Sequence, residues 1–368
     1  MNLNRRQVLA AAATAAGSGA LAGCTDDGSA AESATTATTT QASFFVFGDI
    51  AEHVAGDAAT AELLVPVGQH GHGWEPGPRV REAIRDADLF VHGMTGFQPW
   101  VDDITADLDA DGADVATVDA SADVDLLAIS GGHDEPAGEH DTAHDGDHNE
   151  TDADGDHTET AHNETTHDGH NETAHTEETD HHSDEEHDHG SGMDPHFWMD
   201  PLRVKTATDT VQQAIGTVDP DNAETYADNA AAFQDDLDDL HEQIESTVAD
   251  ASSDMLLVAG HNAFQYLSDR YDVTVASLTN VSPDDRPTSR DIQRAQELIE
   301  THDLQYICAD PLESQRAATQ LVADTDAEGV LPLTAIPGLT DEWEQDGLGY
   351  IEIMETVNLP TLERVFDA

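Results

Sequence analysis

Basic residues are scarce in this sequence of 368 residues. Lys and Arg together number 13 against 77 Asp and Glu, Lys205 is the only lysine, and the formal net charge is −64. A surface this negative repels phosphate groups, which excludes nucleic acid and anionic membrane surfaces as partners. Cations are the ligands that such a field attracts.

Cysteine and apolar residues are also few. The two cysteines, Cys24 and Cys308, cannot build a disulfide framework. Cys308 lies in an apolar run, which predicts a buried and unreactive thiol. Apolar residues make up 38% of the chain, below the roughly 45–50% of ordinary globular domains. Histidine, by contrast, is abundant, with 21 residues.

The negative charge is spread over the whole chain. Residues 133–190 hold 13 His, 21 Asp or Glu and neither Lys nor Arg, and the remaining residues still carry a net charge of −43. Such a surface suits a protein that works in very high salt, where charge repulsion is screened within about 3 Å at 1 M. An ordinary acidic extracellular protein is the alternative interpretation.

The N-terminal segment 1–24 has the pattern of an export signal. It carries the pair Arg5-Arg6, followed by an Ala-rich stretch and then by Leu-Ala-Gly-Cys24. The Ala-rich stretch is too short, and its residues are too small, for a stable membrane span. The arginine pair indicates twin-arginine export, and the ending resembles a lipobox, in which Cys24 becomes lipid-modified. Cleavage with an unmodified Cys24 is the alternative. Segment 25–42 is polar and predicts a flexible tether, so we expect a protein anchored by lipid outside the cell membrane.

From residue 43 onward, short apolar runs alternate with amphipathic stretches, which predicts an N-terminal α/β lobe over 43–220. The expected strands are Ser43–Phe47, Glu62–Val67, Asp88–His92 and Asp123–Ile129, and the expected helices are 78–87, 98–108 and 201–218. Residues 131–192 interrupt the lobe as a His, Asp, Glu and Thr segment that cannot bury a core, which predicts a disordered loop.

A long amphipathic helix is expected within 221–250, followed by a C-terminal α/β lobe over 251–368. The helix has apolar residues at steps of three and four from Tyr226 to Val248. The expected strands of the second lobe are Met255–Val258, Val273–Ser277, Leu304–Cys308 and Val330–Leu333, and the expected helices are 262–270, 289–301, 314–324 and 349–366, the last interrupted near Pro360. The predicted fold is therefore α/β, with two lobes of mostly parallel sheets joined by one connector helix.

Three histidines outside the loop follow predicted strands or begin helices: His72, His196 and His261. Ligands of open α/β folds gather beyond the carboxyl ends of parallel strands. Three imidazoles that meet there would suit Zn²⁺, with a carboxylate or water in a fourth position. Three hydrogen-bonded turn histidines with no ligand role are the alternative on spacing alone.

Five segments, taken in order, resemble the substrate-binding proteins of metal-specific ABC importers, in the zinc and manganese cluster of that family. The matching segments are Pro66 to Pro76, Asp194 to Pro201, Asp219 to Leu240, Gly260 to Leu267 and Gly349 to Leu359. The resemblance covers Ser43 to the C-terminus except the loop. It implies that His72, His196 and His261 are metal ligands, and the third histidine resembles the zinc-preferring members.

Two departures from the family pattern affect the site. The Asp-Pro that usually precedes the first ligand is His70-Gly71 here, and His70 could point into the site. The fourth family ligand is commonly an acid in the last lobe, but the segment 333–340 contains none. Asp341, Glu342 and a water molecule therefore remain open as the fourth ligand.

The His-rich loop also fits the zinc branch of the family, whose members often carry such an insertion. Neutral imidazoles are metal ligands, and neighbouring carboxylates raise their pKa, so the segment 133–190 could load several cations and release them on acidification. We expect it to gather or sense zinc for the main site. A solvated linker with incidental metal affinity is the alternative.

The predicted function is capture of Zn²⁺ outside the cell and its delivery to an ABC permease and its ATPase, by a monomer that is not an enzyme. Mn²⁺ is a weaker expectation, because it prefers oxygen ligands to imidazoles. The alternatives are a manganese- or iron-binding member of the same family, a metal-buffering surface protein and a zinc hydrolase. Against a hydrolase, the sequence has no His-Glu-x-x-His helix, and Glu75 is the nearest candidate base.

Overall fold

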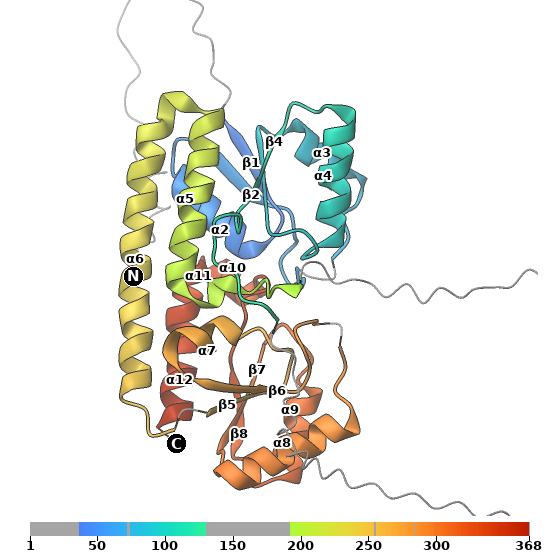
Figure 1. The fold of residues 1–368 in the computed structure, drawn as a ribbon, viewed down its shortest axis with the longest axis vertical. Coiled ribbons are helices and arrows are strands. Elements are labelled where there is room, and N and C mark those ends of the chain that lie inside the picture. The colour runs from blue at the N-terminus through green and yellow to red at the C-terminus, as the bar shows by residue number, and fades with distance from the viewer. Residues whose placement is uncertain (1–36, 72–73, 130–191, 254, 284, 368) are drawn as a thin grey trace, which may run out of the picture. The chain divides into compact units, whose positions relative to one another are not determined.

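The computed structural model describes residues 37–71, 74–129, 192–253, 255–283 and 285–367. The predicted signal segment 1–24 with Cys24, almost the whole His-rich loop, and His72 lie outside the described residues. From Ala37 onward the chain forms a single unit that contains two four-stranded sheets (Figure 1).

The N-terminal sheet is parallel and has the strand order β2-β1-β3-β4. Its strands are β1 Thr39–Ala42, β2 Thr60–Leu63, β3 Leu89–His92 and β4 Ala116–Asp119. The helices of this part are α2 Phe45–Ala55, α3 Pro78–Asp86, α4 Pro99–Asp111 and α5 Pro201–Val218. In Figure 1, α5 lies on one side of the sheet, and α3 and α4 lie on the other.

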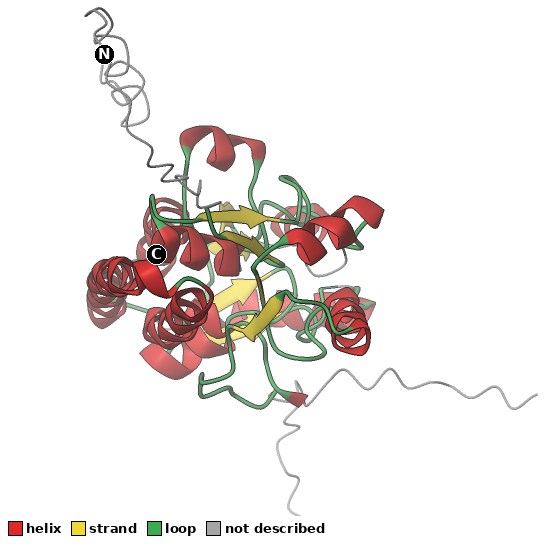
Figure 2. Ribbon diagram, turned by 90° about the horizontal axis from the view of Figure 1, so that it is seen from above, coloured by secondary structure: helices red, strands yellow, loops and turns green. Residues whose placement is uncertain are grey.

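The C-terminal sheet repeats this design with the parallel order β6-β5-β7-β8. Its strands are β5 Met255–Val258, β6 Thr274–Ser277, β7 Tyr306–Ala309 and β8 Gly329–Pro332. The helices are α7 Gln265–Tyr271, α8 Ser289–His302, α9 Arg316–Asp324, α10 Asp341–Asp346, α11 Tyr350–Ile353 and α12 Leu359–Phe366. Figure 2 shows helices on both sides of the strands, so the predicted fold class is confirmed.

The predicted connector helix is present as α6, Ala223–Ala249. Its buried side chains form the stripe expected from the sequence: Tyr226, Ala230, Phe233, Leu237, Leu240 and Ile244. The helix packs against α2 and α5 at one end and against α7, α11 and α12 at the other. A continuous hydrophobic core therefore runs through both lobes, from Ala42 to Phe366.

The prediction of a strand at Ser43–Phe47 was wrong, because α2 begins at Phe45. The apolar run is buried on every side of a central helix, so its composition resembles that of a buried strand. Strand β1 instead occupies Thr39–Ala42, inside the segment predicted to be a flexible tether. That prediction is corrected for these four residues, whose backbones pair with both β2 and β3.

Two further differences concern element boundaries. Asp123–Ile129 is not a strand, since only Ala128 forms a single bridge, to Met193, and the fourth strand of the sheet is β4. Near the C-terminus, α10 precedes the expected helix, and a π-helical turn, Met354–Asn358, separates α11 from α12. This turn directly precedes α12, which begins at Leu359 with Pro360 in its first turn, so the interruption expected near Pro360 is present.

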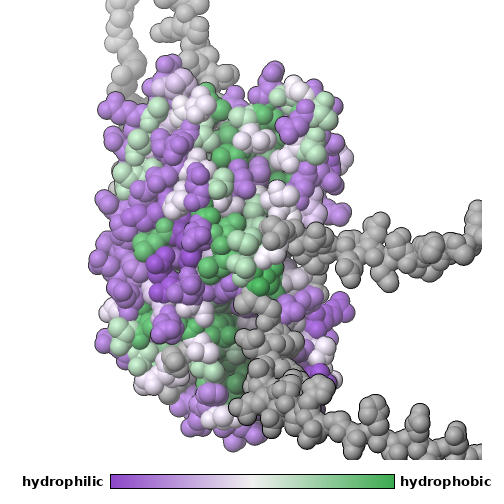
Figure 3. Space-filling view, in the orientation of Figure 1, coloured by the Kyte–Doolittle hydropathy of each residue, from purple (hydrophilic) through white to green (hydrophobic). Residues whose placement is uncertain are grey.

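Polar side chains dominate the face shown in Figure 3, with smaller apolar areas between them. Among the described residues, no helix has both the length and the apolar composition needed to cross a membrane.

Candidate metal centre

The candidate site lies where loops from both sheets meet beyond the carboxyl ends of their strands. His70 follows β2 and His196 precedes α5, whereas His261 follows β5 and Glu313 follows β7. Parallel strands direct their carboxyl ends to one edge of a sheet, so the topology brings together residues that are far apart in sequence.

His196 is fully buried and is held by a carboxylate two residues earlier in the chain. Its Nδ1 lies 2.7 Å from Asp194 Oδ1, and the same oxygen accepts a hydrogen bond from the His196 backbone N–H at 2.9 Å. Burial lowers the pKa of His196 below its ordinary value, although Asp194 opposes this shift. The imidazole is therefore held neutral, the form that binds metals, and Nε2 is the nitrogen that can act as a ligand.

His261 has the same arrangement in the C-terminal lobe. It is 5% exposed, and its Nδ1 lies 2.7 Å from Glu313 Oε1. Burial opposes ionisation of Glu313, but the imidazoles of His261 and His70 outweigh it and lower the pKa of Glu313 to about 2. Glu313 is therefore a carboxylate at any physiological pH, and its contact with Nδ1 leaves Nε2 of His261 as the nitrogen that can act as a ligand.

The histidines of the two lobes are neighbours. The ring centroids of His196 and His261 are 5.3 Å apart, and those of His70 and His261 are 6.0 Å apart. His70 Nε2 lies 3.6 Å from Glu313 Oε1. Among the described residues, which do not include His72, no group of three His, Cys, Asp or Glu side chains has the spacing to enclose a metal ion.

Residues of the C-terminal lobe hold the turn that carries His196. Tyr266 Oη donates a hydrogen bond to Asp194 O at 2.6 Å, and Tyr350 Oη donates one to Trp198 O at 2.5 Å. Trp198 Nε1 donates to Ala335 O at 2.8 Å. His196 is therefore positioned by both lobes, which favours a ligand site that forms between them.

The sequence-predicted site residues have different outcomes. His196 and His261 come together, whereas His72 and Cys24 lie outside the described residues. Asp341 and Glu342 are exposed in the first turn of α10. Cys308 is buried as expected, and burial raises the pKa of its thiol to about 12.

Sequence reasoning missed Glu313 and the role of Asp194. Asp194 carried a signal, since it stands two residues before a candidate ligand. Glu313 carried none, because a single glutamate after a strand is indistinguishable from the other surface acids of this chain. Only the pairing of β5 with β7 brings it next to His261.

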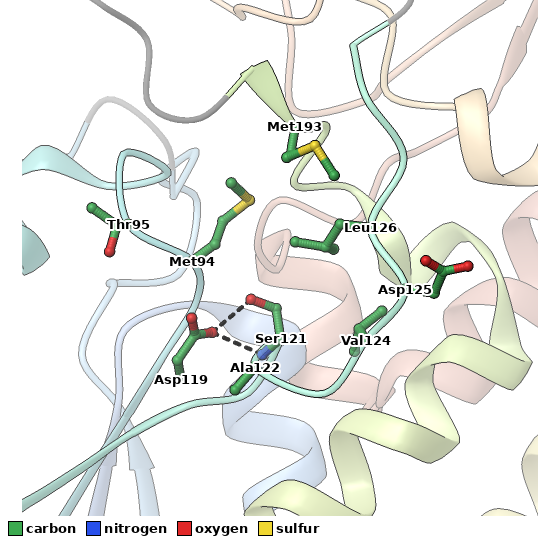
Figure 4. A pocket seen from close by; sticks show the side chains of 9 residues that line it. All are labelled: Met94, Thr95, Asp119, Ser121, Ala122, Val124, Asp125, Leu126 and Met193. Carbon is green, nitrogen blue, oxygen red and sulfur yellow. Dashed lines mark hydrogen bonds between the residues drawn. The ribbon is translucent and has the colours of Figure 1, made fainter.

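A separate pocket of about 410 Å³ lies near the strand ends of the N-terminal sheet (Figure 4). Its lining residues are Met94, Thr95, Asp119, Ser121, Ala122, Val124, Asp125, Leu126 and Met193. Asp119 accepts hydrogen bonds from the Ser121 hydroxyl and backbone N–H, so this acid is already engaged. Neither His196 nor His261 is among the described residues that line the pocket.

Solved structures share this two-lobed α/β fold. The Zn(II)-bound ZnuA-like domain of AdcA from Streptococcus pneumoniae superposes with a TM-score of 0.65 at 24% identity, over 90% of this chain and all of that domain. The metal-dependent lipoprotein YcdH from Bacillus subtilis gives a TM-score of 0.65 at 23% identity, over 90% and 100% of the two chains. This chain therefore belongs to the class of two-lobed α/β proteins with two parallel sheets.

Residues 41–365 match the family described as the zinc-uptake complex component A, periplasmic, and the chain belongs to this family. It is 27% identical over 325 residues to the zinc-binding lipoprotein AdcA of Streptococcus pneumoniae. That alignment covers 88% of this chain and 55% of AdcA. It is 27% identical over 321 residues to the high-affinity zinc uptake system protein ZnuA of Bacillus subtilis, covering 87% and 85%. This chain therefore spans about half the length of its AdcA relatives.

Proposed function

We propose that this protein captures Zn²⁺ between its two lobes and delivers it to an ABC permease for import. The observation that carries the proposal is the approach of His196 and His261 from opposite lobes, each with Nδ1 against a carboxylate. A carboxylate behind an imidazole is the usual support of a zinc-binding histidine. Membership of a zinc-uptake family and the names of its zinc-binding relatives support the same cargo.

In this proposal His72, His196 and His261 are the three protein ligands. Three imidazoles suit zinc, with Zn–N bonds of about 2.0–2.1 Å and a fourth position for oxygen, and they suit Mn²⁺ poorly. The strongly negative net charge of the protein favours the approach of a cation to either lobe.

Location and partners follow from the sequence patterns. Segment 1–24 is proposed to direct twin-arginine export, Cys24 is proposed to carry the lipid anchor, and the partner is a membrane permease with its ATPase. The protein is proposed to act as a monomer and to catalyse no reaction. Because one buried core spans both lobes, we expect only small closure around the ion, so that release depends on contact with the permease.

Zinc titration against a chelating dye tests the ligand assignment. His72→Ala, His196→Ala and His261→Ala are each expected to raise the zinc Kd about 100-fold or more, since even loss of an outer carboxylate costs 10–100-fold. His302→Ala is the matched control, because His302 is exposed at the end of α8. The proposal fails if all three variants bind zinc as the wild type does.

A deletion variant tests the role of the His-rich loop. Deletion of 133–190 is expected to leave one tightly bound zinc per chain and to slow growth where zinc is scarce. A loop-deleted protein that binds no zinc would instead favour the metal-buffering alternative, and unchanged growth would reject any role of the loop in uptake.

A further inference from the structure

We propose that Glu313 is a positioning residue of the zinc site, which fixes the ring of His261 and draws His70 of the other lobe toward it. This inference rests on the proposed zinc function and extends it to a residue outside the predicted ligand set. Glu313 acts through imidazoles, so its contribution is to hold ligand geometry and to balance the charge of the bound ion.

The first argument is the shape of the space around the carboxylate. One oxygen, Oε1, lies 2.7 Å from His261 Nδ1. The other, Oε2, lies against Gly260, where a Cβ atom would stand only 2.7 Å from it. A Cβ atom at residue 260 would therefore force the Glu313 carboxylate to shift from the position in which it contacts the ring.

The second argument is that the loop carrying Glu313 is rigidly held. Buried Asp310 accepts hydrogen bonds from Leu312 N at 2.8 Å and from the Thr334 hydroxyl at 2.7 Å. The Glu313 backbone N–H donates to Asp310 O at 3.0 Å. The backbone that carries Glu313 is thus held by β7 and the loop after β8, whose residue Ala335 also accepts the hydrogen bond from Trp198.

The third argument is the symmetry of the two candidate ligands. Asp194 stands behind His196 in one lobe as Glu313 stands behind His261 in the other, with equal Nδ1–oxygen distances of 2.7 Å. A carboxylate in this position makes the imidazole a stronger donor and fixes its tautomer. Each lobe therefore supplies one histidine together with its own supporting acid.

Glu313 also crosses the boundary between the lobes. Its Oε1 lies 3.6 Å from His70 Nε2, on the loop after β2. That loop is attached to the C-terminal lobe by two backbone hydrogen bonds, from Gly68 N to Leu339 O at 2.7 Å and from Gly71 N to Pro337 O at 3.1 Å. One carboxylate thus joins His261 to the segment that leads into the predicted ligand His72.

The test compares zinc binding by the full chain and by Glu313→Gln, which keeps the shape and removes the charge. We expect the zinc Kd to rise about 10–100-fold. Glu300→Gln, an exposed acid of α8, is the matched control with the same change of charge. A Kd within twofold of the wild type in Glu313→Gln would overturn the proposal.

Two spectroscopic readouts separate positioning from other roles. The zinc X-ray absorption spectrum of Glu313→Gln is expected to keep the wild-type number of imidazoles and oxygens, and loss of an oxygen would show that Glu313 is itself a ligand. The Nδ1–H proton resonance of His261, assigned from its absence in His261→Ala, is expected downfield in the wild type and shifted in Glu313→Gln. An unshifted resonance would contradict the contact with His261.

A double-mutant cycle tests the contact across the lobes. Glu313→Gln and His70→Ala are expected to raise the zinc Kd non-additively, and strictly additive effects would reject the part of the proposal that concerns His70. Gly260→Ala gives an independent check, since its Cβ displaces the carboxylate and should weaken zinc as Glu313→Gln does. If His196→Ala loses zinc while the Glu313 and Gly260 variants bind normally, this inference fails and the proposed function stands.

Discussion

Asp200 closes the turn that carries His196, and its replacement should destabilise the fold strongly. The carboxylate is fully buried. Its Oδ2 pairs with Arg203 Nη1 at 2.8 Å and with Arg270 Nη2 at 2.7 Å, and its Oδ1 accepts a hydrogen bond from Leu202 N as the N-cap of α5. Arg270 belongs to α7, so this acid links the His196 turn to the C-terminal lobe.

The magnitude follows from these contacts. Removing one partner of a buried ion pair costs about 3–5 kcal/mol. The two arginine side chains are 12% and 33% exposed and can recover part of their hydration, so we expect about 3 kcal/mol for Asp200→Asn. Asn still caps the helix, whereas Asp200→Ala also removes the cap and should cost roughly 1 kcal/mol more.

Urea unfolding followed by circular dichroism, in molar KCl, measures both variants. High salt screens surface charges but affects buried pairs much less, so the effect of Asp200 should persist. Asp269→Asn is the control, because Asp269 is 47% exposed and pairs with the same Arg203 at 3.1 Å, for which we expect less than about 1 kcal/mol. Equal losses of unfolding free energy in Asp200→Asn and Asp269→Asn would refute the reasoning.

Two further predictions concern the site and the effect of pH. Asp194→Asn should weaken zinc binding about 10–100-fold, because the amide supports the His196 ring less well than the carboxylate does. An unchanged Kd in a chelator competition assay would contradict this prediction. Burial raises the pKa of Asp49 to about 6, so the folded state holds a proton that the unfolded state has lost, and stability falls as the pH rises from about 4 to 6. Asp49→Asn should remove this fall, so its free energy of unfolding should rise relative to that of the wild type by up to about 3 kcal/mol between pH 4 and 7. Parallel pH profiles of the two proteins would contradict this prediction.

Periodicity was a good guide to the long and strongly patterned elements. The stripe of apolar residues along α6 appears in the structure as the buried face of a helix that lies within the predicted range 221–250. It was a poor guide at Ser43–Phe47, where an apolar run is buried on all sides and no alternation distinguishes strand from helix. Strand β4, Ala116–Asp119, was missed because its short run mixes polar and apolar residues at a sheet edge.

By itself, the sequence determined the charge, the two-lobed α/β pattern, the family and the turn around His196, because each depends on composition or on residues close together in the chain. Only the tertiary structure decided which acids support the histidines. Glu313 meets His261 because β5 and β7 are neighbours in one sheet, and it meets His70 because loops of two sheets come together. Contacts of this kind depend on long-range packing, which no local pattern of residues specifies.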